Sequence, residues 1–186
     1  MALKSVAVFF ALATRAVYSF IGFPGSPEQH LYLHHDGYPT GAAWRFATAR
    51  RLNGDPAAFL QAFVATQPGA EQLSAPQQAA DAEYRYRVAL DASTTAEVQV
   101  QVQCWRRLPG SSDWHPRCTR VALTDFILRF LLQCALLGSA CVLAYGSSGS
   151  LWAPVLIHWL AVAAWLGPLE GHRCLPGAKP HESAAP

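Results

Sequence analysis

The sequence has few charged residues, and they are unevenly placed. Lysine and arginine number 14 and aspartate and glutamate 12 in 186 residues, so charged residues make up 14% of the chain and the formal net charge is +2. This near-neutral balance provides no basic field of the kind that nucleic-acid-binding proteins carry. Between Arg129 and Glu170 no charged side chain occurs. The composition therefore argues against a nucleic-acid partner and separates a charged part from an uncharged part.

The sequence also lacks a CxxC pair. Its cysteines are odd in number, and two of them lie within apolar segments. We interpret them as reduced thiols of a protein whose soluble part faces the cytosol. The five are Cys104, Cys118, Cys134, Cys141 and Cys174.

Two long apolar segments occupy the uncharged part, residues 126–145 and 151–169, joined by the sequence GSSGS. A transmembrane helix needs about 20 mostly apolar residues to cross about 30 Å of hydrocarbon, and both segments are close to that length. Arg129 lies within a turn of the first segment's start, where its guanidinium can reach the headgroups. The pattern predicts a two-helix transmembrane hairpin.

Arginines flank this hairpin on both sides, whereas its connecting loop is uncharged, so both flanks are expected in the cytoplasm. We therefore expect a membrane protein with a cytoplasmic soluble domain and with lipid as one partner. The alternative is two buried helices of a soluble protein, because Gln133, His158 and several small residues dilute the apolar segments.

The predicted organisation has four parts. Residues 1–13 are an N-terminal extension or a weak signal-like segment, and cleavage there would invert the topology. Residues 14–125 form a soluble α+β domain, residues 126–169 the membrane hairpin, and residues 170–186 a disordered tail. The domain is long enough to bury a core of its own.

Within the domain, the sequence predicts a small antiparallel sheet with two or three helices. Residues 14–23 and 29–35 are typical of two strands of a meander, and the second ends at Asp36-Gly37. Residues 41–52 are compatible with a helix. Asp55 then supplies an N-cap, followed by proline, for a second helix that ends near residue 67. The apolar stripe of that helix consists of Phe59, Leu60, Phe63 and Val64.

Two later segments, residues 82–90 and 96–105, alternate between apolar and polar residues as strands with one buried and one wet face do. The wet face is either solvated or a recognition surface for a partner. The predicted buried side carries Tyr84, Tyr86, Val88, Val98, Val100, Val102 and Cys104, and the predicted wet side carries Glu83, Arg85, Arg87, Gln99, Gln101 and Gln103.

Arginine and aromatic residues are interleaved around the loop that the sequence predicts after these strands. Such a mixture can stack bases, but beside an apolar segment it favours anchoring at a bilayer surface. The cluster comprises Trp105, Arg106, Arg107, Trp114, His115 and Arg117. The predicted interaction residues of the chain are Tyr38, Arg85, Arg87, Arg106 and Arg107.

The densest group of chemically able residues spans residues 30–39, HLYLHHDGYP. His30, His34 and Asp36 are candidate ligands of a divalent metal, and His34, His35 and Asp36 are candidates for acid–base catalysis. His115 and Cys118 would complete a metal site only if the fold brought them close. The structural alternative is a turn at Asp36-Gly37, with the proline fixing the entry into the next helix.

Two parts of the chain resemble known protein groups. Residues 14–132, with TRAVYSF, HLYLHHDGYPTGAAWRF and DAEYRYRV, resemble small uncharacterised bacterial proteins, cyanobacterial and phage-associated ones among them, that share an HxDGYPxGAA signature. That group brings no established activity. Residues 134–167, strongest at GSLWAPVLIHWL, resemble the C-terminal end of the CPBP (CAAX-type) intramembrane metalloproteases, and the resemblance implies that His158 corresponds to a histidine of their catalytic site.

The chain departs from the CPBP pattern, since the EExxxR and FxxxH motifs of that family are absent. A lone histidine cannot hold a catalytic metal ion, so this part is expected to be inactive by itself, as a fusion or a remnant. Three function classes remain open: a membrane-tethered interaction or regulatory module without catalysis, a metal-dependent or acid–base enzyme, and a nucleic-acid-binding protein. We favour the first, with no resident cofactor and an unidentified protein partner.

Overall fold

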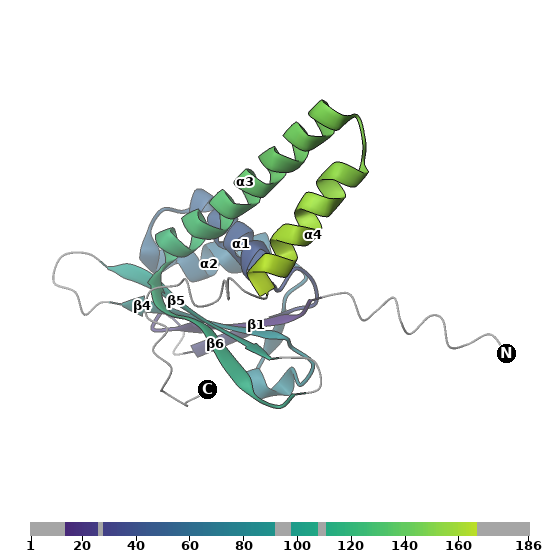
Figure 1. Cartoon of the computed structure of the whole chain (residues 1–186). Coiled ribbons are helices and arrows are strands. Elements are labelled where there is room, and N and C mark those ends of the chain that lie inside the picture. Colours follow the sequence, from purple (N-terminus) through teal and green to yellow (C-terminus); the bar gives the residue numbers. More distant parts are fainter. Residues whose placement is uncertain (1–13, 26–27, 92–97, 108–110, 167–186) are drawn as a thin grey trace.

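The computed structural model describes residues 14–25, 28–91, 98–107 and 111–166, and for residues 165 and 166 it describes the backbone alone. The predicted N-terminal extension over 1–13, the predicted tail over 170–186 and the loop at 92–97 lie outside the described residues. The fold is α+β, with a six-stranded mixed sheet and four helices (Figure 1).

The sheet has the strand order β3-β2-β1-β4-β5-β6. The strands are β1 (Ala16–Ile21), β2 (Glu28–Leu33), β3 (Glu71–Leu73), β4 (Tyr84–Asp91), β5 (Gln99–Arg107) and β6 (Trp114–Ala122). The central strand β1 pairs antiparallel with β2 and parallel with β4, and the remaining pairs are antiparallel. The prediction of an antiparallel sheet is therefore wrong for one pair, because the chain crosses over two helices between β2 and β4.

Helices α1 (Pro39–Leu52) and α2 (Phe59–Thr66) lie together on one side of the sheet (Figure 1). Both predicted helices are confirmed. The predicted cap is also present: the Asp55 carboxylate accepts a hydrogen bond of 2.9 Å from the Ala57 N–H, which begins a short 3₁₀ turn, Pro56–Ala58, ahead of α2. A second 3₁₀ turn, Pro76–Gln78, precedes β4. Val64, predicted in the apolar stripe of α2, is instead 38% exposed.

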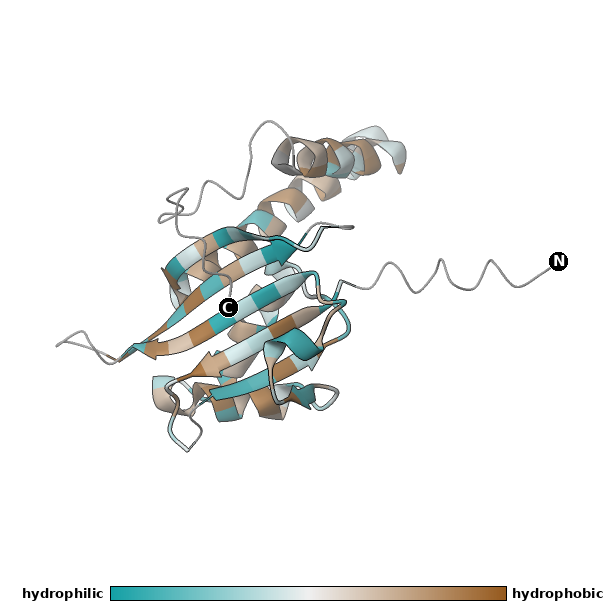
Figure 2. Ribbon diagram, turned by 90° about the horizontal axis from the view of Figure 1, so that it is seen from below, coloured by the Kyte–Doolittle hydropathy of each residue, from teal (hydrophilic) through white to brown (hydrophobic). Residues whose placement is uncertain are grey.

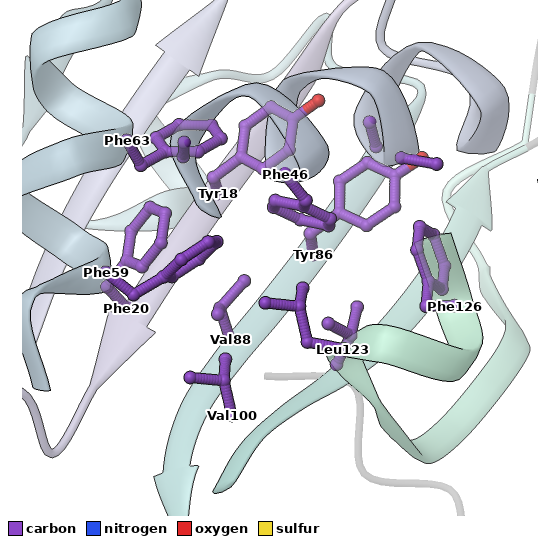
Figure 3. Close-up of a cluster of buried hydrophobic side chains, with 14 of the residues drawn as sticks. Tyr18, Phe20, Phe46, Phe59, Phe63, Tyr86, Val88, Val100, Leu123 and Phe126 are labelled. Carbon is purple, nitrogen blue, oxygen red and sulfur yellow. The ribbon is translucent and has the colours of Figure 1, made fainter. Parts of the chain in front are cut away.

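An aromatic core fills the space between the helices and the sheet (Figure 3). Tyr18 of β1 stacks on Tyr86 of β4 with ring centroids 4.9 Å apart, and both contact Phe46 of α1. The alternation predicted for β4 and β5 is confirmed, since the alternate residues from Tyr84 to Cys104 on the predicted face are buried. There are two exceptions: Val98 is 47% exposed because it precedes β5, and Arg85, predicted on the wet side, is buried because its side chain packs over the Trp114 ring.

Helix α3 (Leu123–Ser148) changes surroundings along its length. Its first turns close the core: Leu123, Phe126 and Phe130 are buried, and the Phe126 ring lies 5.7 Å from that of Phe46. From Leu132 onward α3 runs away from the sheet, with α4 (Trp152–Leu166) returning beside it (Figure 1). We call residues 132–166 the arm and the rest of the described chain the body.

Helix α3 is long and apolar enough to cross a membrane, judged by length and composition, and only 11% of its most apolar stretch is buried. Helix α4 is apolar and shorter. Many large apolar side chains of the arm are exposed, among them Leu136, Leu143, Leu151, Trp152, Trp159 and Leu160. The arm therefore contains the apolar residue types of a protein core, but most of its large side chains are not buried.

Candidate functional site

The DGYP segment forms a turn that is fixed by close packing. Asp36 has φ +52°, a left-handed conformation that aspartate adopts more readily than most residues. A Cβ on Gly37 would lie 2.8 Å from Ala16, and a Cβ on Gly41 would lie 2.2 Å from the Asp36 carbonyl oxygen. The Gly37 carbonyl also accepts a 2.7 Å hydrogen bond from the buried Tyr86 hydroxyl. Both glycines of the signature are thus explained by backbone packing.

The predicted metal ligands do not converge. His34 Nε2 lies 2.8 Å from a carboxylate oxygen of Glu71, and the His34 ring packs on Tyr32, with centroids 4.6 Å apart. His35 is exposed beside it, with ring centroids 6.4 Å apart. The His30 ring contacts Ser19 and Glu28 instead. Among residues 14–25, 28–91, 98–107 and 111–166, no three His, Cys, Asp or Glu side chains are grouped so that they could hold a metal ion.

His115 and Cys118 lie on β6, at the opposite edge of the sheet from β3 and β2. Cys118 faces the core, directly opposite Cys104 on β5, and both thiols are buried and free. Burial, together with the neighbouring Cys118, raises the pKa of Cys104 well above its usual range. The Cys104 thiol therefore stays protonated and chemically inert.

His30 takes part in a polar row that crosses four adjacent strands. In the register of the sheet, His30 lies opposite Ser19, Ser19 lies opposite Arg87, and Arg87 lies opposite Gln103. The His30 Nδ1 lies 2.9 Å from the Ser19 hydroxyl, and its Nε2 lies 3.6 Å from a Glu28 carboxylate oxygen. We call His30, Ser19, Arg87 and Gln103 the polar row. It lies on the sheet face opposite the core, which α1, α2 and α3 leave uncovered (Figure 2). Part of this face is covered by the segment around the second 3₁₀ turn, where Val17, Tyr32, Ala79 and Ala82 form a smaller buried cluster.

A serine hydrogen-bonded to a histidine is the pairing found in nucleophilic catalysis. Oxyanion stabilisation would also require donors aimed at the reacting carbonyl group. Ser19 lies in β1, which is paired with a strand on each side. The backbone N–H groups around it therefore already donate hydrogen bonds to the neighbouring strands. The hydroxyl therefore has a structural explanation, as the partner of a histidine that is only 7% exposed.

The predicted interaction arginines do not form one surface. Arg85 and Arg107 lie over the ring of Trp114, with guanidinium carbons 4.2 and 5.3 Å from its centroid. Arg106 lies 5.7 Å from the centroid of the Tyr84 ring. Burial, and secondarily the charge of Arg107, lowers the pKa of Arg85. Residues 114–122, for which the sequence predicted no strand, form β6, so these side chains lie on strands of the sheet on either side of the loop.

Arg87 differs from the other arginines because its side chain is exposed on the uncovered sheet face. It forms no ion pair with a described residue. Gln103 beside it is half-buried. Of the predicted wet face, Arg87 and Gln99 are therefore exposed, Glu83, Gln101 and Gln103 are half-buried, and Arg85 is buried.

A cleft of about 740 Å³ lies beside the DGYP turn, where α3 leaves the body. Asp36 and Tyr38 of the turn, Trp44 and Arg45 of α1, and Leu131 and Cys134 of α3 line it. Tyr38 is 42% exposed and Trp44 is 63% exposed, so two aromatic rings stand at the cleft. Of these residues, sequence reasoning selected Asp36 and Tyr38 and missed the rest, because the contact between α1 and α3 spans almost 90 residues of chain.

Arg45 is held in position at this cleft. It donates to the Gln67 side chain and, over 2.9 Å, to the His35 carbonyl oxygen. Its Nε and the nearby Tyr18 hydroxyl are both buried without a well-formed hydrogen bond. Burial raises the pKa of Tyr18 far above its usual value, and the Arg45 charge acts in the opposite direction. No carboxylate of a described residue lies within 4.0 Å of Arg45.

His158 lies exposed on α4. No aspartate or glutamate occurs in the arm, so no carboxylate of the arm can serve it as a partner.

Comparison of the chain with protein-family models, with curated proteins and with solved structures found no match.

Proposed function

We propose that this chain is a membrane-tethered, non-catalytic interaction module: the arm inserts into a bilayer as a two-helix hairpin, and the body presents its uncovered sheet face to a partner protein in the aqueous phase. The observation that carries this proposal is the exposure of the arm. Its large side chains are apolar and uncovered, and no charge occurs from residue 130 to residue 169. Exposed apolar surface of this extent marks a membrane or protein contact.

The length of the arm supports insertion from one side. The 17 residues of α3 from Leu132 onward extend about 25 Å at 1.5 Å per residue, slightly less than the hydrocarbon thickness of about 30 Å. A local thinning of the bilayer accommodates such a mismatch at small cost. In this arrangement the body lies at the surface where the hairpin enters, and the flanking arginines favour the cytoplasmic side for it.

The resemblance of residues 134–167 to the end of the CPBP intramembrane proteases supports a membrane location for the arm. We propose that His158 performs no catalysis in a single copy of the chain, since hydrolysis by a metal-bound water needs several ligands and a base. In the hairpin, His158 would bind a polar group of a neighbouring helix or subunit.

Fractionation tests the tether. The full chain is expected in the membrane pellet after alkaline carbonate, and a chain ending after Gln133, which keeps Phe126 and Phe130, is expected in the supernatant with its circular dichroism intact. Release of the full chain by carbonate would contradict insertion.

The partner surface is tested separately by a photo-crosslinking residue in place of Gln103 on the uncovered sheet face. In the cells that produce the chain, we expect one discrete adduct, and none when the crosslinker replaces Gln61, which is exposed on α2. The same adducts from both positions, or none from Gln103, would contradict a partner on this face.

A further inference from the structure

We propose that the cleft between the DGYP turn, α1 and α3 binds one phospholipid molecule through a zwitterionic, ammonium-bearing headgroup such as phosphoethanolamine. This inference rests on the proposed insertion of the arm, which would place the cleft at the membrane surface. It goes further by assigning a specific ligand to residues of the body.

The position of the cleft selects a lipid. Leu131 and Cys134 line it and belong to the turns of α3 that lead directly into the arm. A molecule in the cleft therefore lies against the body on one side and at the start of the exposed apolar surface on the other. A ligand with a polar head and an acyl chain matches both surroundings.

The charges of the cleft select the headgroup. Arg45 is a cation with no carboxylate within 4.0 Å, and two of its five N–H donors are bound to Gln67 and His35. Arginine binds phosphate through several such donors. Asp36 lines the same cleft as an anion, and its carboxylate accepts a hydrogen bond of 3.3 Å from Tyr38. One cation and one anion that do not pair with each other match the phosphate and the ammonium of a zwitterion.

The aromatic side chains at the cleft fit the same ligand. Trp44 and Tyr38 are exposed to an extent that is unusual for large rings in a body whose other aromatic residues are mostly buried. Tryptophan and tyrosine are enriched at the headgroup level of membranes, and their rings attract ammonium groups. Both rings would lie at that level if the arm is inserted.

Cys134 offers a direct measurement of occupancy because it is exposed and lines the cleft. The full chain in maltoside micelles is treated with N-ethylmaleimide, and modification of Cys134 is followed by peptide mass spectrometry. Dihexanoylphosphatidylethanolamine should slow this modification in a saturable manner, whereas inorganic phosphate and free phosphoethanolamine should not. Cys104 and Cys118, buried in the core, should stay unmodified throughout and report that the body remains folded.

Two variants assign the headgroup contacts. Arg45→Gln should weaken protection by the lipid about tenfold, which corresponds to the loss of one hydrogen bond to a charged group. Arg51→Gln, an exposed arginine in the last turn of the same helix, is the matched control and should leave protection unchanged. Asp36→Asn keeps a residue type that tolerates φ +52° and should abolish the preference for phosphatidylethanolamine over phosphatidylglycerol.

Three results would overturn the proposal: equal protection by phosphatidylglycerol in the unaltered chain, equal protection in Arg45→Gln and Arg51→Gln, or no protection by any lipid. If the full chain still resists carbonate extraction in those cases, the lipid site fails while the membrane tether stands. If carbonate releases the full chain while Cys134 is protected, the tether fails and the cleft still binds lipid.

Discussion

The body and the arm are built from similar apolar residues, and a single helix, α3, runs through both. In the body, Phe126 is fully buried and packs against the ring of Phe46. In the arm, four to five turns later, Leu143 is 73% exposed. The difference shows that hydrophobicity along a helix does not identify its surroundings. The body buries its apolar residues within the chain, whereas the arm leaves its own exposed, and we propose that a bilayer covers them.

The largest effect is expected when a charge is placed on one or the other face of β5 and the free energy of unfolding is compared. Val102→Asp puts a carboxylate at a fully buried position, and we expect a loss of about 5 kcal/mol or more, enough to unfold the body. Gln103→Asp, the next residue on the uncovered face, should change the free energy of unfolding by no more than about 0.5 kcal/mol. Urea denaturation of the full chain in detergent measures both, and equal tolerance would contradict the assigned faces.

A second prediction compares two positions on α3 itself. Phe126→Ala removes a buried ring and should cost about 3–5 kcal/mol in the stability of the body. Leu143→Ala removes an exposed side chain and should cost less than about 0.5 kcal/mol. The same urea titration measures both. A small loss at Phe126 would mean that the start of α3 does not close the core.

The third prediction concerns a change that should affect membrane insertion of the arm and leave the stability of the body unchanged. Leu143→Lys should oppose membrane insertion by about 3 kcal/mol, the cost of a lysine near the centre of a spanning helix, while leaving the urea midpoint of the body unchanged. Leu52→Lys makes the same change at an exposed leucine of the body and should leave the carbonate-resistant fraction unchanged. If both variants remained in the pellet equally, the arm would not be embedded in lipid.

The smallest effect concerns the alkaline stability of the body. Burial and a 2.8 Å hydrogen bond to Asp81 raise the pKa of Tyr32 to about 12, above the unfolded value of about 10. The folded state therefore holds this proton more tightly, so its contribution is complete below pH 10 and is lost as the pH rises toward 12. Tyr32→Phe should flatten this part of the stability profile, measured by urea midpoints between pH 9 and about 12. An unchanged slope would contradict the buried, bonded hydroxyl.

Sequence reasoning predicted the local features of the body well. The alternation of Tyr84, Tyr86 and Val88 with arginines identifies the two faces of β4 because a strand has a period of two. Asp55 followed by proline identifies the start of a helical segment through the chemistry of its cap. These signals are contained within a few residues, and the structure confirms them.

Features that depend on distant residues were missed. The parallel pairing of β1 with β4 joins segments almost 70 residues apart, and no local pattern encodes it. Strand β6 has the irregular sequence WHPRCTRVA, with a proline and register shifts against β5, so it does not alternate as a regular strand does. The cleft depends on α1 meeting α3, and for that reason neither Arg45 nor Cys134 could be assigned to it from the sequence.

The central claim, that apolar residues of the body and the arm lie in different solvents, is tested most directly by spin labels on two exposed leucines. Cys134, Cys141 and Cys174 are replaced by serine, and a nitroxide is attached at Leu143→Cys or Leu52→Cys in the full chain in liposomes. We predict that the label at 143 collides with oxygen far more than with a water-soluble nickel complex, and that the label at 52 shows the reverse. Equal access of the nickel complex to both labels would contradict the account.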